Sequence, residues 1–298
     1  MSLQMNDGSQ NPPRIEIHQA MWGMSGLGEN GRFWTLEEQL DKIAEAGFTG
    51  ITGAPPTEEA RKRVERYGLK YGGGGFPWTA GDLEPMLRRA KDNGSMYFNS
   101  QVLDNFVIGE EAIRRLAEMT ELAARIGMPH FVETHRGRIT QDIIRTADYV
   151  QAIADLRLTI DFSHYVVNTE LDGFVPQTAE TAEGYFQLLL QRTSSIHARV
   201  SNGHQVQADI GPEGTESQAE RFYKWWETGM RNWLQQAGPG DILPFIVELG
   251  PPPYALTRTV NAYNDTEITD RWQQALAIKK RVETIVDRLM AERQTNGE

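Results

Sequence analysis

The feature that most constrains the fold of this chain is an eightfold alternation of short apolar segments with helical patterns. Each apolar segment has the length of a strand, and the intervals between them place apolar residues at helical spacing. Parallel strands need such crossover connections, and eight repeats predict an α/β fold, the (β/α)8 TIM barrel. The expected strands are IEIHQAMW, FTGIT, LKYGGGG, SMYFNSQV, MPHFVE, LRLTIDF, SIHARV and ILPFIVEL.

The length of 298 residues suits one barrel domain, for which we assign residues 14–290. Nothing that resembles a linker interrupts this range. Residues 1–13 are polar and end in two prolines, so we expect a disordered N-terminal tail. Residues 291–298 are expected to form a C-terminal tail.

Three local motifs bear on the helices and loops. Thr35 with Glu38, and Ser217 with Glu220, have the spacing of capping boxes and predict two helix starts. The segment Gly26–Gly31 is a literal GxGxxG after a strand. However, three further residues separate it from the expected helix, and no acidic residue closes the next strand, so it does not indicate dinucleotide binding.

The composition limits the chemistry. Cysteine is absent, which excludes disulfides, thiolate ligands and a cysteine nucleophile, so any metal must be held by oxygen and imidazole. The formal net charge of −11 disfavours binding to nucleic acid, whose phosphates attract clustered lysine and arginine. No apolar run approaches the roughly 20 residues of a membrane span, and no leader is recognisable. We therefore expect a cytoplasmic protein without nucleic-acid or membrane partners.

Each of the last four expected strands ends on a side chain that can bind a metal: Glu133, Asp161, His197 and Glu248. Because catalytic groups of such barrels lie at the carboxyl ends of the strands, these four residues are expected to converge. Three carboxylates and one imidazole suit one divalent metal ion, Mn²⁺, Mg²⁺ or Co²⁺, and Zn²⁺ remains open. The alternative is four strand ends that carry unrelated polar groups.

Glu133 and Glu248 close strands that two others separate, so they can face a bound cation from opposite sides. The cation would polarise a chelated carbonyl, while one glutamate removes the neighbouring proton and the other returns one. A metal-chelated enediolate of this kind leads to isomerisation or epimerisation. If a leaving group lies β to the carbonyl, the same carbanion eliminates it.

Two residues near these strand ends are candidates for substrate binding. His164 lies three residues beyond Asp161 and could contact substrate or orient that carboxylate. Arg199 shares a strand face with the histidine two residues before it and should point to the same mouth. It could bind a substrate hydroxyl, carboxylate or phosphate, or form an ion pair with Glu248 or Asp161.

Three further candidates for substrate binding lie on other segments. His135 shares the pleat of Glu133, whereas its neighbour Arg136 is expected to face solvent or pair with a helix. Gln101 could bind sugar hydroxyls or fill the barrel interior. Trp22 could stack on a sugar face or pack in the core.

The order Glu, Asp-x-x-His, His, Glu on the last four strands resembles that of the xylose-isomerase-like TIM barrel superfamily, in particular its sugar epimerases and isomerases. The resemblance spans residues 14–290. It implies a sugar or keto-sugar substrate and makes a homo-oligomer, a dimer or tetramer, compatible with the family. It assigns Glu133 and Glu248 as the acid/base pair, His164 as a substrate contact, and as metal ligands Glu133, Asp161, His197 and Glu248.

The chain departs from two branches of that superfamily. Ketose epimerases carry an arginine a few residues beyond the strand-seven histidine, where this chain reads SNGHQVQ. The family-2 apurinic endonucleases use additional histidines that are missing here. The predicted function is a divalent-metal-dependent sugar or keto-sugar isomerase or epimerase. The alternatives are a keto-sugar or inosose-type dehydratase or lyase, an endonuclease-like phosphodiester hydrolase, and a non-catalytic sugar-binding barrel.

Overall fold

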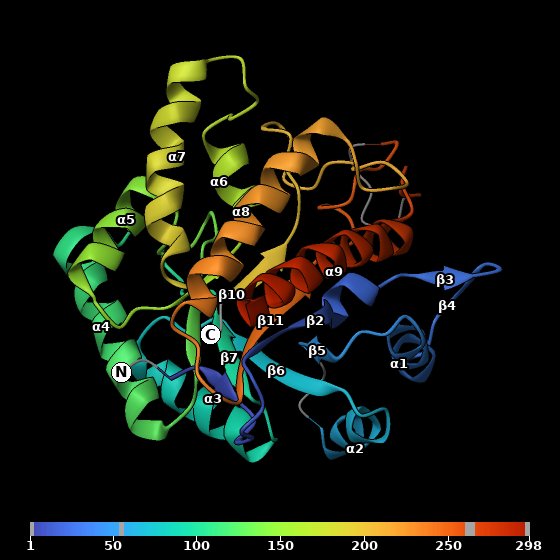
Figure 1. The fold of residues 1–298 in the computed structure, drawn as a ribbon, viewed down its shortest axis with the longest axis horizontal. Coiled ribbons are helices and arrows are strands. Elements are labelled where there is room, and N and C mark those ends of the chain that lie inside the picture. Colours follow the sequence, from blue (N-terminus) through green and yellow to red (C-terminus); the bar gives the residue numbers. More distant parts are fainter. Residues whose placement is uncertain (1–2, 54–56, 260–265, 296–298) are drawn as a thin grey trace.

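A computed structural model describes residues 3–53, 57–259 and 266–295 (Figure 1). Eight parallel strands form a sheet that closes where β11 pairs with β2, which confirms the predicted (β/α)8 TIM barrel. Each of the eight expected strand segments overlaps a barrel strand. In chain order these are β2 (Arg14–Ala20), β5 (Gly50–Thr52), β6 (Lys70–Gly75), β7 (Tyr97–Ser100), β8 (His130–Glu133), β9 (Leu158–Ile160), β10 (Thr193–Ala198) and β11 (Asp241–Val247).

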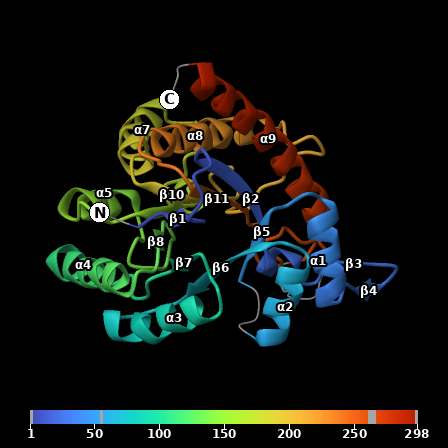
Figure 2. The ribbon, with the colours of Figure 1, turned by 60° about the horizontal axis from the view of Figure 1, so that its bottom comes forward.

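The helices surround the strands as an outer layer (Figure 2). Their inner faces bury the large apolar core between helices and sheet. No helix of the described residues has both the length and the apolarity that a membrane crossing requires. The helices are η1 (Met21–Met24), α1 (Leu36–Glu45), α2 (Glu58–Arg66), α3 (Ala80–Asp92), α4 (Gly109–Ile126), α5 (Ile143–Ala152), α6 (Ser163–Asn168), α7 (Pro176–Leu190), α8 (Ser217–Leu234) and α9 (Arg271–Thr295).

One of the two expected capping boxes is present. Thr35 accepts a hydrogen bond from the backbone of Glu38, whose side chain in turn accepts from the backbone of Thr35, at the start of α1. The box expected at Ser217 is wrong, because α8 already includes this residue and the chain before it supplies no side-chain cap. Glu220 instead forms an ion pair with Arg281 of α9, so it joins two outer helices.

In the part of the chain that the structure describes, three short strands lie outside the barrel, and both ends are more ordered than expected from the sequence. In the segment predicted as a disordered tail, Met5–Asn6 forms β1, which pairs antiparallel with β11. Met5 is fully buried. At the other end, α9 continues to Thr295, beyond the expected end of the domain. The glycine-rich GxGxxG segment contributes to a small hairpin of β3 (Gly28–Glu29) and β4 (Arg32–Phe33).

The interior of the barrel is filled by side chains, so the strands enclose a packed core with a cavity at one end. Tyr97 and Phe131 stack there with ring centroids 5.8 Å apart. Glycine in the neighbouring strand leaves room for the tyrosine, since a Cβ at Gly72 would lie 2.3 Å from Tyr97 Cζ. Gly72 thus lets a side chain of the barrel interior approach the backbone of β6 closely. Gly74 lines the cavity at the carboxyl ends of the strands.

We predict that Gly72→Ala lowers the free energy of unfolding by about 1–3 kcal/mol, because the added methyl group overpacks against Tyr97. Gly74→Ala is the matched control, since the nearest atom to its added Cβ is the backbone oxygen of Asn99 at 3.4 Å. Its effect should be about 0.5 kcal/mol or less. Urea denaturation of both variants measures the difference. Equal losses at the two positions would contradict this packing.

Candidate metal centre and active site

Three side chains from different strands meet at the carboxyl-terminal end of the barrel. Glu133 closes β8, His197 lies in β10, and Glu248 directly follows β11. His197 Nδ1 lies 3.5 Å from Glu133 Oε2 and 3.2 Å from Glu248 Oε2. One donor atom from each residue lies within 4.8 Å of the others, which makes this group a candidate metal site. All three are buried, as expected for groups inside a barrel mouth.

The imidazole of His197 links the two glutamates electrostatically. Burial opposes its protonation, but the carboxylates of Glu248 and Glu133 raise the pKa of His197 well above its usual range. Burial also opposes ionisation of Glu133, and the charge of His197 nevertheless lowers the pKa of Glu133 to about 2. Within the described residues neither ring nitrogen of His197 has a hydrogen bond of good geometry. A buried orphan nitrogen beside two carboxylates fits a cation, which would take the place of the proton.

Arg199 joins the carboxylates of Asp161 and Glu248. Its Nη1 donates to Asp161 Oδ2 at 2.7 Å, and its Nη2 donates to Glu248 Oε2 at 2.5 Å. Its Nε donates to the backbone oxygen of Glu248 at 3.1 Å. The side chain is 1% exposed, so these ion pairs are shielded from water. The ion pair expected between Arg199 and Asp161 or Glu248 therefore exists with both.

Asp161 stands apart from the three converging ligands. It belongs to no group of candidate metal ligands among the described residues, and one of its carboxylate oxygens contacts Arg199. The other oxygen accepts hydrogen bonds from the backbone N–H and the hydroxyl of Ser163. Ser163 is the first residue of α6, so these bonds lie where the helix begins. Burial raises the pKa of Asp161 to about 6 against the opposing effect of Arg199.

The charges of this site leave room for one divalent ion. Glu133, Asp161 and Glu248 bring three carboxylates, and Arg199 brings one permanent positive charge. In the ionised state these groups leave two negative charges, which one dication would neutralise. Buried charge of one sign is costly without such compensation. The donor set is dominated by carboxylate oxygen, which suits a hard metal ion.

The neighbouring strand orients Glu133. Asn99 Nδ2 donates to its Oε2 at 2.7 Å, and Gln101 Nε2 approaches both carboxylate oxygens at 3.3 Å. Arg138 in turn donates to Gln101 Oε1 at 2.9 and 3.1 Å and fixes which end of the amide faces the glutamate. Thr140 donates to the backbone oxygen of Glu133 at 2.6 Å. The carboxylate is thus held in place from several sides.

A cavity of about 350 Å³ opens over this site, large enough for a small polar molecule. Gln101 and Trp22 line it together with the three candidate ligands. The glycines of β6 form one wall and leave space because they lack side chains. The lining residues are Ala20, Trp22, Thr52, Gly53, Tyr71, Gly73, Gly74, Gly75, Phe76, Asn99, Gln101, Glu133, His197 and Glu248.

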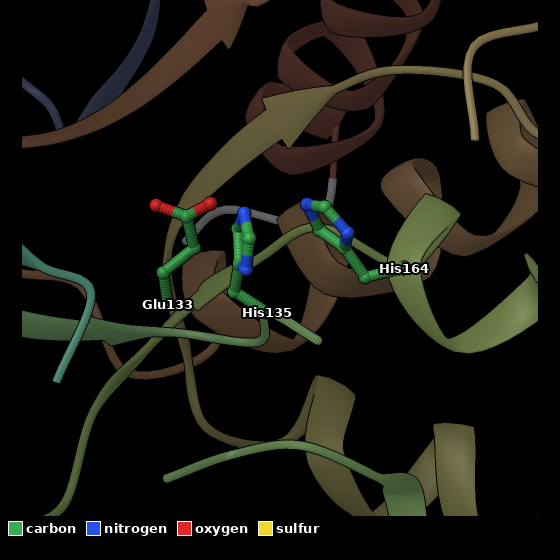
Figure 3. A group of neighbouring side chains, drawn as sticks. All are labelled: Glu133, His135 and His164. Carbon is green, nitrogen blue, oxygen red and sulfur yellow. The ribbon is translucent and has the colours of Figure 1, made fainter. Parts of the chain in front are cut away.

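A second group of side chains adjoins the first and shares Glu133 with it (Figure 3). The rings of His135 and His164 lie 3.7 Å apart, and the ring of Tyr254 lies 6.2 Å from that of His164. Burial lowers the pKa of His135 to about 4, and it lowers the pKa of His164 well below the usual range. Both imidazoles are therefore neutral near pH 7.

The structure brings most of the expected site residues to one mouth, each at the end of its strand or in the segment that follows. Trp22 packs edge-to-face against Tyr254 with ring centroids 5.0 Å apart, and the guanidinium of Arg199 lies 4.8 Å from the same tyrosine ring. Tyr254 and Arg138 were not identified from the sequence. The only available signal for Tyr254 was its position in a proline-rich loop directly after the strand that ends before Glu248.

Comparison with known proteins reveals similarity in structure alone. No family model matches the chain, and no curated protein matches its sequence. D-psicose 3-epimerase of Clostridium cellulolyticum H10, solved with D-tagatose, superimposes with a TM-score of 0.57 at 10% identity, over 91% of this chain and 99% of that one. The chain has the fold of the xylose-isomerase-like TIM barrels.

Two further solved structures are similar to this chain. A xylose isomerase-like TIM barrel protein from Mycobacterium smegmatis, in complex with magnesium, has a TM-score of 0.54 at 12% identity and covers 97% of this chain and 99% of its own. A xylose isomerase domain protein from Planctomyces limnophilus has a TM-score of 0.51 at 11% identity, over 95% of this chain and 99% of that one.

We predict that Arg199→Gln destabilises the metal-free protein by about 3–5 kcal/mol, because Asp161 and Glu248 lose their buried counter-ion. Added Mn²⁺ should restore much of this loss by neutralising the same carboxylates. Arg231→Gln is the control, since this arginine pairs with acids on the surface and should contribute about 1 kcal/mol or less. Thermal and urea unfolding measure both variants. A similar loss in the two would contradict the account of Arg199.

Proposed function

We propose that this protein is a divalent-metal-dependent isomerase or epimerase of a sugar or keto-sugar that works by proton abstraction beside a carbonyl. The main support for this proposal is a pair of buried glutamates, Glu133 and Glu248. Both lie close to the same nitrogen of His197, and all three side chains line a cavity at the barrel mouth. Two carboxylates at one site can remove a proton and return one to the same carbon skeleton. The fold that this chain shares with D-psicose 3-epimerase supports the same reaction class.

The residues that would hold the metal are Glu133, His197 and Glu248. Asp161, which the sequence suggested as a fourth ligand, would stay paired with Arg199, which also binds Glu248. When bound, the ion would polarise the substrate carbonyl and acidify the neighbouring C–H. Magnesium accompanies one of the similar structures, and the donor set suits Mn²⁺, Mg²⁺ or Co²⁺.

The protein side chains perform the proton transfers in this proposal. Asn99 and Gln101 donate hydrogen bonds to the Glu133 carboxylate, which keeps it ionised and able to accept a proton from the carbon next to the carbonyl. The resulting enediolate would take a proton back at the neighbouring carbon, or at the same carbon from the opposite face. Glu248, steadied by Arg199, would be the second acid/base group.

We predict that Glu133→Gln and Glu248→Gln each lower the exchange of substrate C–H with solvent deuterium by about 10²–10⁴-fold, since each loses one acid/base group. The panel is D-psicose, D-fructose and D-tagatose with Mn²⁺, scored by NMR for deuterium uptake and for product. Glu16→Gln is the control, because this buried carboxylate lies on β2 and pairs with Lys70, away from the ligand group. Full exchange in Glu248→Gln would contradict the two-base mechanism.

The same assay separates the related reactions. Epimerisation returns a ketose, isomerisation an aldose, and elimination a dehydrated product with loss of water. Removal of the metal by a chelator should abolish exchange, and added Mn²⁺ should restore it. Exchange that persists in the chelated protein would refute the metal requirement.

A further inference from the structure

Two arginines at the mouth have no acidic partner in the part of the chain that the structure describes. Within the described residues no carboxylate lies within 4.0 Å of the guanidinium of Arg136 or Arg138. Arg138 donates to Gln101 and to the backbone of Gly137, and both acceptors are uncharged. Arg136 was expected to face solvent or pair with a helix, but it is half-buried with its guanidinium 5.9 Å from the ring of Tyr254. The segment after β8 therefore carries two positive charges that no carboxylate of the described residues neutralises.

One of the two imidazoles beside these arginines, that of His164, offers a hydrogen-bond donor without an acceptor among the described residues. Arg199 Nη1 lies 3.2 Å from His164 Nε2, and since a guanidinium only donates, Nε2 accepts and Nδ1 carries the proton. His164 is fully buried, and its Nδ1 has no partner among the described residues. A buried donor without an acceptor indicates that a ligand oxygen completes the site. His135 Nδ1 donates to the backbone oxygen of Arg136, and its Nε2 faces the hydroxyl of Tyr254 at 3.4 Å.

A second metal ion on His135 and His164 fits these observations poorly. A metal needs the lone pair of a ring nitrogen, but the contact with Arg199 leaves a proton on His164 Nδ1. The charges of Arg199, Arg136 and Arg138 all act on His164, so a cation there would meet like charge. Two carboxylates would oppose this repulsion, but Glu133 already faces His197, and Asp161, 3.6 Å from His164 Nε2, is already paired with Arg199.

We propose that the basic side of the mouth, formed by His135, Arg136, Arg138, His164 and Tyr254, binds an oxyanion carried by the substrate, either a phosphate ester or a carboxylate. This inference rests on the proposed function, which gives the substrate a sugar skeleton, and it assigns a negatively charged group to that substrate. Two unpaired guanidinium groups match the charge of a phosphate dianion, and arginine binds both oxyanions through paired N–H donors. The acidic side of the mouth, with Glu133 and Glu248, would face the reacting carbons.

The test compares the binding of three compounds to the Mn²⁺-loaded protein by isothermal titration calorimetry. D-fructose, D-fructose 6-phosphate and 5-keto-D-gluconate are keto-sugars that differ in charge, with no charged group, a phosphate and a carboxylate respectively. At least one charged compound should bind about tenfold or more tightly than D-fructose, as expected for hydrogen bonds to a charged group. The one that binds best identifies the oxyanion.

Variants test whether the tighter binding of a charged compound depends on the basic side of the mouth. Arg136→Gln should remove the advantage of the charged compound, whereas Arg136→Lys should keep part of it because the charge remains. Arg157→Gln is the matched control, since Arg157 is also half-buried, has no carboxylate of the described residues within 4.0 Å, and directly precedes β9, at the opposite end of the barrel. It should leave all three affinities unchanged.

Equal binding of the three compounds, absence of binding by both charged ones, or an advantage that survives in Arg136→Gln would each overturn the proposal. Deuterium exchange is scored separately on the same compounds. A charged compound that binds through Arg136 without exchange would support the oxyanion subsite and count against the proposed reaction. Exchange restricted to D-fructose, unaffected by Arg136→Gln, would support the reaction and overturn the subsite.

Discussion

The buried guanidinium of Arg199 is the contact on which the arrangement of this site depends. It binds Asp161 and Glu248 at once, and the rings of Trp22 and Tyr254 lie within 6 Å of it. Carboxylates so shielded from water would repel one another without a positive charge between them. Because the arginine comes from the chain just after β10, it ties the ends of β9, β10 and β11 into one unit.

The barrel and the positions of its strand-end residues could be predicted from the sequence, since apolar runs and helical spacing are local properties. Glu133 and His197 meet because parallel strands end at one edge. The partner of Asp161 could not be predicted, because a cation and a guanidinium compete for the same carboxylate and only side-chain geometry decides between them. Tyr254 lies in an irregular loop, and Met5 in a polar segment without strand periodicity, so neither had a local signal.

The mouth of the barrel is divided by charge. On one side the carboxylates of Glu133 and Glu248 face His197, and on the other Arg136 and Arg138 stand beside two neutral imidazoles. This division explains why the two neighbouring groups of potential metal ligands favour ions of opposite charge. The acidic side suits a dication, and the basic side suits an anion. A substrate with a carbonyl at one position and a negative charge at another would match both.

The most direct test of this division is the position of Mn²⁺ in crystals of the protein, located by anomalous diffraction. We expect one strong peak in contact with Glu133, His197 and Glu248, and none at the ring nitrogens of His135 and His164. A peak on those two imidazoles, or no peak at the three ligands when Mn²⁺ is in excess, would contradict this division.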